Sequence, residues 1–131
     1  MKNYFTKETE QVLKGWDRKI YMSSVPGKPD HMQLTKPLPC GESFIPLDFL
    51  WDGASTGVLR RVFILWFPKW KHPIATCRHD WRCSLAKTKE ERKIADKLFR
   101  EDVGVSGTRW EQFKGYLGVR IGAIFGVGTH Y

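Results

Sequence analysis

One histidine and two acids are the residues in this chain whose types and spacing could do chemistry. His79 is followed directly by Asp80, and Asp96 comes further along the chain. If the segments around His79 and Asp96 are helices that fold back on each other near Lys87, both residues lie about 13 Å from that turn, at about 1.5 Å per residue. The sequence therefore predicts an imidazole that faces a carboxylate at one level of a helical hairpin.

This pair has two interpretations. In the catalytic one, His79 is a general base, Asp96 orients its ring, and oxygens of Asp80 and Asp52 hold a hard cation such as Ca²⁺. In the structural one, the same contacts only fix the register of two helices, since buried ion-pair networks perturb ionisation without catalysing a reaction. A buried carboxylate needs a partner in either case. The residue types leave both open, although the structural interpretation is the more frequent for an isolated His and Asp pair.

The three cysteines predict neither a metal site nor a disulfide. Cys77, His79 and Cys83 would project from different faces of one helix, which argues against a shared Zn²⁺ ion. Cys77 and Cys83 would also be roughly 9 Å apart, beyond the reach of a disulfide. We therefore expect three free thiols, with Cys40 as the third, in a chain that folds in a reducing cytoplasm.

The composition predicts one folded domain that spans residues 1–131. At 131 residues the chain is long enough for one core, and an aromatic share of 14% excludes a disordered polar chain. The net charge of +8 lies entirely within residues 58–100, which hold twelve Lys and Arg against four Asp and Glu. Such a local field favours anionic partners, namely phosphates, lipid head groups, nucleic acid or an acidic protein surface. Nucleic acid is the weakest candidate, because only charge supports it.

The segment 63–71 interleaves aromatic residues with lysines. This pattern suits a protein contact or a membrane interface in which rings are buried and lysines form the rim. Alternatively, the rings belong to the core and the lysines are simply solvated. No apolar run is long enough to span a bilayer, and residues 1–5 lack the apolar region of a signal peptide. We expect a partner surface that consists of Arg60, Arg61, Trp66, Lys69, Trp70 and Lys71.

The chain as a whole predicts an α+β fold, with a small N-terminal antiparallel sheet packed against a C-terminal half of three helices. Residues 1–57 are mainly strands and loops, and residues 58–131 are mainly helical. The elements expected in the first half are a helix at 6–16, strands at 19–23, 31–35 and 44–51, a turn at 25–30, a break at 37–41, and a loop of small residues at 52–57.

The three helices of the second half are predicted from their first turns. Pro73 suits the start of one helix, and apolar residues repeat at helical spacing after it. Thr88 with Glu91, and Thr108 with Glu111, match the capping box, in which a hydroxyl and a carboxylate satisfy each other's backbone donors. These two boxes predict helices at 89–103 and 109–125, with a break at 104–107.

The last of these helices carries two different stripes. One stripe consists of large apolar residues: Trp110, Phe113, Leu117, Ile121 and Ile124. The other consists of Gly118, Gly122 and Gly126, which allows backbones to pack closely and is costly on an exposed helix. The glycine spacing favours close helix packing inside the fold over a dimer face in a membrane.

Three motifs in order resemble a small family of uncharacterised proteins from tailed bacteriophages and prophages. They are a segment at 45–55 that ends in Asp-Gly-Ala-Ser, then His-Asp-Trp at 79–81, then Ala-Asp-Lys-Leu-Phe at 95–99. The resemblance covers about residues 18–125, and the proline usually expected soon after Ala-Ser is replaced by Thr56-Gly57-Val58. The signature positions that it implies are Asp52, Ser55, His79, Asp80 and Asp96.

This first resemblance implies a phage-encoded protein that is made in the host cytoplasm and incorporated in the virion or its tail. Its implied partners are phage structural proteins. With the basic and aromatic surface above, the leading prediction is a docking protein that binds these partners.

A second resemblance supports an alternative function. His79-Asp80 together with residues 94–102 is similar to the helical pair of calcium-dependent secretory phospholipases. It implies His79 as the base, Asp80 as a Ca²⁺ ligand and Asp96 as the residue that orients His79. The glycine-rich calcium loop and the disulfides of those enzymes are absent, and only the loop at Asp52 could replace the former. The alternative is therefore a metal-dependent hydrolase of phospholipid or cell-envelope material.

Overall fold

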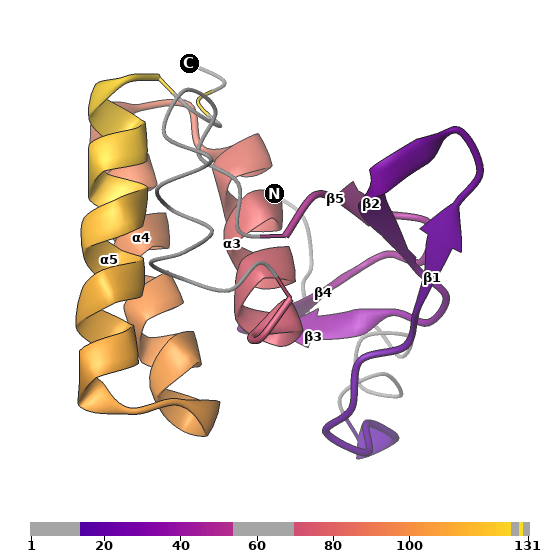
Figure 1. Ribbon diagram of the computed structural model, residues 1–131. Helices are drawn as coiled ribbons and strands as arrows, with labels where there is room; N and C mark the ends of the chain where they lie inside the picture. The colour runs from indigo at the N-terminus through magenta and orange to yellow at the C-terminus, as the bar shows by residue number, and fades with distance from the viewer. Residues whose placement is uncertain (1–13, 54–69, 127–128, 130–131) are drawn as a thin grey trace. The chain divides into compact units, whose positions relative to one another are not determined.

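The computed structural model describes residues 14–53, 70–126 and 129. The fold is α+β as predicted, because a small antiparallel sheet in the N-terminal half is followed by three helices (Figure 1). The chain divides into two compact units, Met1–Asp52 and Gly53–Tyr131, and each is described by itself. That the two form one domain, with the sheet on the helices, stays a prediction. Residues 6–13 of the expected first helix and 54–57 of the expected loop lie outside the described residues.

The first unit contains a three-stranded antiparallel sheet in the order β1, β2, β5. β1 (Met22–Val25) and β2 (Lys28–Leu34) form a hairpin, and Gly27 in its turn has a φ of 79°, which glycine adopts without strain. The short β5 (Leu50–Trp51) pairs with the other edge of β2. The predicted turn at 25–30 is too long, because β2 already begins at Lys28, and β1 begins later than the predicted strand at 19–23.

A separate two-stranded sheet corrects the prediction for residues 37–51. β3 (Leu38–Cys40) pairs with β4 (Ser43–Ile45), although the two prolines of residues 37–41 predict a break. The expected strand at 44–51 is interrupted after β4, because Pro46 has no N–H to donate and Asp48 has a φ of 76°. Its two ends therefore belong to different sheets. Among residues 14–52, the fully buried large side chains are Leu34, Leu38, Ile45 and Trp51.

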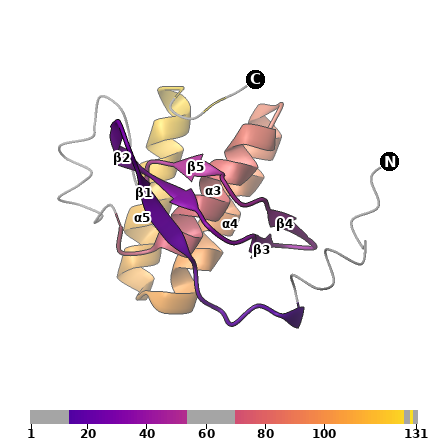
Figure 2. The same ribbon diagram turned by 90° about the vertical axis from the view of Figure 1, so that its right-hand side faces the viewer.

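Three helices form the described part of the second unit (Figures 1 and 2): α3 (Pro73–Leu85), α4 (Lys89–Ser106) and α5 (Arg109–Ile124). Both predicted N-caps are confirmed, since the hydroxyls of Thr88 and Thr108 accept hydrogen bonds from the backbone N–H groups of Glu91 and Glu111. The full capping box forms at Thr108, whereas the Glu91 carboxylate accepts the backbone N–H of Lys87 in place of that of Thr88. The predicted break at 104–107 is largely wrong, because α4 continues through Ser106.

α4 packs against both α3 and α5. The core of the unit consists of Ala75 from α3 with Phe99 and Val103 from α4, and Val119 of α5 packs against them. The helical hairpin that the sequence predicts is thus formed by α3 and α4. Within the described residues, no helix combines the length and the apolar character that crossing a membrane requires.

The two stripes of α5 lie on different sides of the helix. Its buried residues are all glycines: Gly115, Gly118 and Gly122. Gly126 lies beyond the helix end, in a turn with a φ of 76°, so it does not extend this buried side as predicted. The large apolar residues point outward, with Ile121 half-buried. The exposed members, here called the α5 apolar face, are Trp110, Phe113, Leu117 and Ile124.

Candidate functional site

His79 and Asp96 face each other across the α3–α4 hairpin. Nε2 of His79 lies 2.6 Å from Oδ1 of Asp96, and both side chains are buried, with His79 7% exposed. The ring of His79 also packs at a tilt on Phe99, 4.9 Å between centroids. The contact that the sequence predicts is therefore confirmed, whereas its catalytic role stays a prediction.

Asp96 is the centre of a polar network that joins all three helices. Its Oδ1 accepts a hydrogen bond from Nε of Arg92 at 2.9 Å, and its Oδ2 accepts one from Nη1 of Arg120 at 2.7 Å. Arg92 also donates to the carbonyl of Val119 on α5 at 3.2 Å. Burial opposes the charged form of Asp96, but the hydrogen bond from His79 and the hydrogen bond and charge of Arg92 outweigh it and lower the pKa of the carboxyl.

The environment of His79 keeps its imidazole neutral. Burial lowers the pKa of His79 and outweighs Asp96, which favours the charged ring, while the positive charges of Arg92 and Arg82 lower the pKa further. The second ring nitrogen, Nδ1, lies 3.9 Å from Oδ1 of Asp80. The ring is thus held by a carboxylate at one nitrogen and has another carboxylate near the other, as the catalytic interpretation requires. It is nevertheless a weak base, because its pKa is lowered.

Cys83 corrects the prediction that the cysteines and His79 project from different faces. Cys83 follows His79 by one helical turn, and its Sγ lies 3.4 Å from Nε2 of His79. The ligand atoms of His79, Cys83 and Asp96 all lie within 4.8 Å of one another. Burial raises the pKa of the Cys83 thiol to about 12, so the thiol is neutral. Cys77 is buried on the same helix and is not a member of this group.

The donor atoms of this cluster do not suit calcium. Ca²⁺ takes about six to eight oxygen ligands, and the three side chains offer one nitrogen, one sulfur and one carboxylate. Asp80 lies beside His79, whereas Asp52 follows β5 in the first unit. A Ca²⁺ site shared by Asp52 and Asp80 therefore stays a prediction. Ser55, the remaining signature position, lies outside the described residues.

The predicted partner surface is only partly described. Trp70 is half-buried and Lys71 is exposed. The Nζ of Lys71 lies 2.8 Å from Oε2 of Glu111, so this lysine also makes a contact within its own unit. The other members lie outside the described residues: Arg60, Arg61, Trp66 and Lys69.

A second buried histidine, His72, is absent from the sequence-based site. Its Nδ1 lies 3.0 Å from Oγ of Ser106 and its Nε2 lies 2.9 Å from Oε2 of Glu111, which links the start of α3 to the end of α4 and the start of α5. Hydrogen bonds from Lys71, His72 and the Thr108 backbone lower the pKa of Glu111 to about 2. The capping box identifies Glu111 in the sequence as the residue that caps α5. No sequence feature near His72 indicates that it contacts Glu111.

Several arginines of the basic segment are used inside the fold. Arg78 and Arg82 of α3 donate to the two oxygens of Asp102 at 3.2 and 2.8 Å, and Arg92 donates to Asp96. These contacts hold α3 against α4. Among residues 70–100, the charge presented to a partner is therefore carried more by the lysines than the composition indicates.

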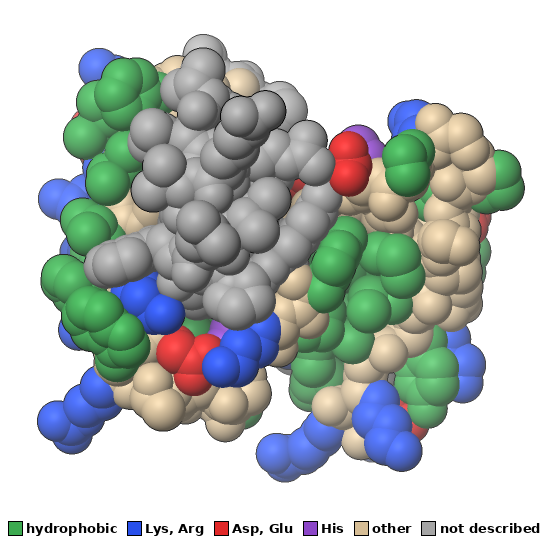
Figure 3. Space-filling view, viewed as in Figure 1, with side chains coloured by type: hydrophobic (Ala, Val, Ile, Leu, Met, Phe, Trp, Pro, Cys, Tyr) green, Lys and Arg blue, Asp and Glu red, His purple; other side chains and the backbone are tan. Residues whose placement is uncertain are grey.

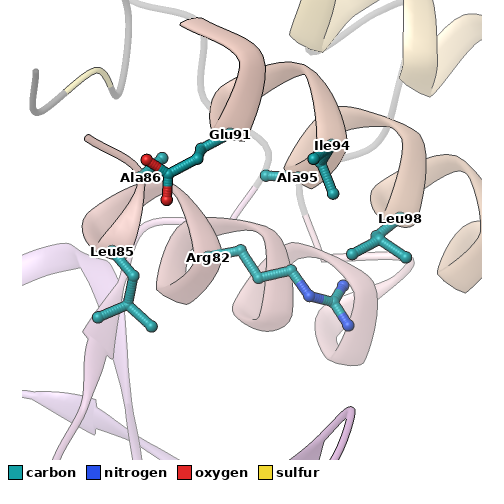
Figure 4. Close-up of a pocket in the computed structure, with 7 residues that line it drawn as sticks. All are labelled: Arg82, Leu85, Ala86, Glu91, Ile94, Ala95 and Leu98. Atoms are coloured by element: carbon teal, nitrogen blue, oxygen red, sulfur yellow. The ribbon is translucent and has the colours of Figure 1, made fainter. Parts of the chain in front are cut away.

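A shallow depression of about 270 Å³ lies between the end of α3 and the first turns of α4 (Figure 4). Its lining is mostly apolar and includes neither His79 nor Asp96. The lining residues are Arg82, Leu85, Ala86, Glu91, Ile94, Ala95 and Leu98. This depression is therefore not the predicted hydrolase site.

Comparison of the chain with protein-family models, with curated proteins and with solved structures gave no match. Both resemblances, to the phage family and to the phospholipases, therefore remain predictions.

Proposed function

We propose that this protein is a phage-encoded docking protein of the virion or tail, which binds structural proteins through exposed apolar and basic side chains. The observation that carries the proposal is the α5 apolar face. Hydrophobic side chains run along the α5 side of the molecule in the space-filling view, with basic side chains beside them (Figure 3). Contiguous exposed apolar surface of this kind is typical of a binding site.

Stability of the fold alone does not explain which residues of α5 are buried and which are exposed. Each glycine in a helix costs about 1 kcal/mol relative to alanine, and α5 has three of them on its buried side. Its large apolar residues, which would stabilise a core, are exposed instead, up to 78% for Ile124. Trp110 and Phe113 stack at 5.7 Å between centroids, and the Nζ of Lys114 lies over the Trp110 ring. Aromatic rings next to a basic side chain are the residues that interfaces favour.

The polar network around Asp96 supports docking over catalysis. Its carboxylate is bonded to two guanidinium groups and to His79, so its charge is already compensated and offers little stabilisation to an imidazolium. A histidine that acts as a general base depends on a carboxylate that stabilises its imidazolium form. The network therefore suits a structural link between α3, α4 and α5.

Virions of the phage that encodes the protein provide the test. We expect the protein to copurify with assembled particles, and its absence from purified virions would contradict the proposal. A variant with Phe113→Ser and Leu117→Ser should lose incorporation while it stays folded. The control is Val105→Ser, which replaces an even more exposed apolar residue of α4 outside the α5 apolar face.

A second function, hydrolysis of phospholipid or cell-envelope esters, is favoured by the position of His79 between two carboxylates. In that reaction Nδ1 would take a proton from the attacking water while Nε2–H stays bonded to Asp96. The test is hydrolysis of mixed-lipid vesicles, with and without calcium, by the native protein and by His79→Ala. Equal rates for the two proteins would exclude this function.

A further inference from the structure

We propose that His79, Cys83 and Asp96 form a binding site for a borderline divalent transition metal, represented by Zn²⁺. The three side chains offer one imidazole nitrogen, one thiol and one carboxylate, the ligand types that zinc uses in proteins. All three residues are buried, and no other group of three or more potential ligands converges among residues 14–53, 70–126 and 129. The inference is independent of the docking function.

Two of the three separations between the ligand atoms are within about 1 Å of those of a tetrahedral site, and the third, between Cys83 and Asp96, is at most 4.8 Å. Metal–ligand bonds of about 2.0–2.3 Å place neighbouring ligand atoms about 3.3–3.7 Å apart in a tetrahedron. Nε2 of His79 and Sγ of Cys83 are already 3.4 Å apart. Nε2 of His79 and Oδ1 of Asp96 are 2.6 Å apart, because they share a proton that the metal would replace. They need to separate by only about 1 Å, which rotation of the two side chains can supply.

The two helices that carry these ligands are held together beside the site. His79 and Cys83 lie one turn apart on α3, and Asp96 lies opposite on α4. The ion pairs from Arg78 and Arg82 to Asp102 fix α3 against α4. A site on two fixed helices loses little conformational entropy when it binds a ligand.

Neighbouring charged side chains lie next to the proposed ligands, where they could orient these ligands without contacting the metal. Arg92 and Arg120 bond one oxygen of Asp96 each, so each oxygen keeps about one further lone-pair position, and the one on Oδ1 that now faces His79 could take a metal. Asp80 lies 3.9 Å from Nδ1 of His79, where metal-bound histidines usually have a carboxylate or carbonyl partner. These contacts would orient the ligands without being displaced.

Binding of one metal ion releases one proton from the site. The ion displaces the thiol proton of Cys83, so a thiolate forms and one proton leaves to solvent. His79 stays neutral and moves its proton from Nε2 to Nδ1, beside Asp80, while Asp96 remains a carboxylate. The step adds one positive charge near Arg92 and Arg120, which limits the affinity, and Asp80 partly offsets that charge.

The test is titration of the full-length reduced protein with Co²⁺ alone, followed by near-ultraviolet and visible absorption, and then displacement by Zn²⁺. We expect one Co²⁺ per chain, with a thiolate-to-cobalt charge-transfer band that Zn²⁺ abolishes. Cys83→Ser should remove the band and weaken binding at least about tenfold, and Asp80→Asn should weaken it about tenfold. Cys77→Ser is the matched control, and its titration should equal that of the native protein.

The result that overturns the proposal is the absence of a band in the native protein, or a band that survives Cys83→Ser or disappears with Cys77→Ser. Far-ultraviolet circular dichroism checks that each variant is folded. If Cys83→Ser is unfolded, Cys83→Ala serves in its place, and the native titration alone still decides whether the site exists. Incorporation into virions by Cys83→Ser should be unchanged, which separates this test from that of the docking function.

Discussion

Oε2 of Glu111 lies 2.9 Å from Nε2 of His72, while Oε1 of the same carboxylate accepts the backbone N–H of Thr108 at 3.2 Å. One side chain therefore closes the cap of α5 and also links α5 to the start of α3. Helix capping and tertiary contact are joined in a single group, so the loss of Glu111 should affect both.

Glu111→Gln should lower the free energy of unfolding by about 1–2 kcal/mol, because a glutamine can still complete the capping box but loses the hydrogen bonds that depend on the carboxylate charge. The amide keeps the shape of the side chain but removes the charge that Lys71 and His72 contact. Urea unfolding followed by circular dichroism measures the change. Glu101→Gln, at an exposed position of α4, is the control and should change stability by less than about 0.5 kcal/mol.

Acid should remove the stabilisation that Glu111 provides. The pKa of Glu111 is lowered from 4.5 to about 2 in the folded protein, so the unfolded chain binds a proton first as the pH falls. The contribution is complete above about pH 5 and is lost as the pH falls toward 2. The stability difference between the native protein and Glu111→Gln should therefore be smaller at pH 3 than at pH 6. An unchanged difference would show that the carboxylate charge is unimportant.

Asp96→Asn should destabilise the second unit strongly, by about 3–5 kcal/mol, because it removes the carboxylate charge that the buried guanidinium of Arg92 contacts. Thermal unfolding measures the loss. Arg120→Met should cost less, since the side chain of Arg120 is partly exposed and Asp96 keeps its contacts with His79 and Arg92. Equal losses for the two variants would contradict the central position of Asp96.

Substitutions on the two sides of α5 should differ in how much they lower the stability of the protein. Phe113→Ser on the α5 apolar face should change the free energy of unfolding by less than about 0.5 kcal/mol, as exposed sites do. Gly118→Leu on the buried side should destabilise by about 1–3 kcal/mol or more, because a large side chain is inserted into a packed interior. Chemical unfolding of both variants checks the assignment, and a larger loss for Phe113→Ser would reverse it.

Features set by local chemistry could be predicted from the sequence. The starts of α4 and α5 follow from Thr88 and Thr108, because a capping box involves residues only three positions apart. The contact of His79 with Asp96 could also be predicted, since a short turn forces equal distances along two adjacent helices. The i, i+4 spacing of His79 and Cys83 places both on one face of α3, whereas Cys77 is not a member of that group.

Features that depend on distant contacts could not be predicted. The two stripes of α5 are visible in the sequence, but periodicity does not tell which stripe faces inward. His72 meets Glu111 only because two helix starts come together in space. Pro39 predicts a break, yet it lies in β3 opposite Phe44, because a two-stranded sheet leaves one side of each strand without a ladder.

The buried glycines of α5 have a consequence for how that helix keeps its place. Val119 packs against the α3–α4 core, but the glycines on the same side leave few other knobs to interlock with a neighbour, so shape alone resists sliding poorly along that side. Two polar contacts fix the position of α5 along its axis. Arg120 bonds Asp96 near one end of the helix, and Glu111 bonds His72 at the other. Loss of both contacts would allow α5 to shift along its own axis. The exposed aromatic rings of α5 would then meet a partner at a shifted position.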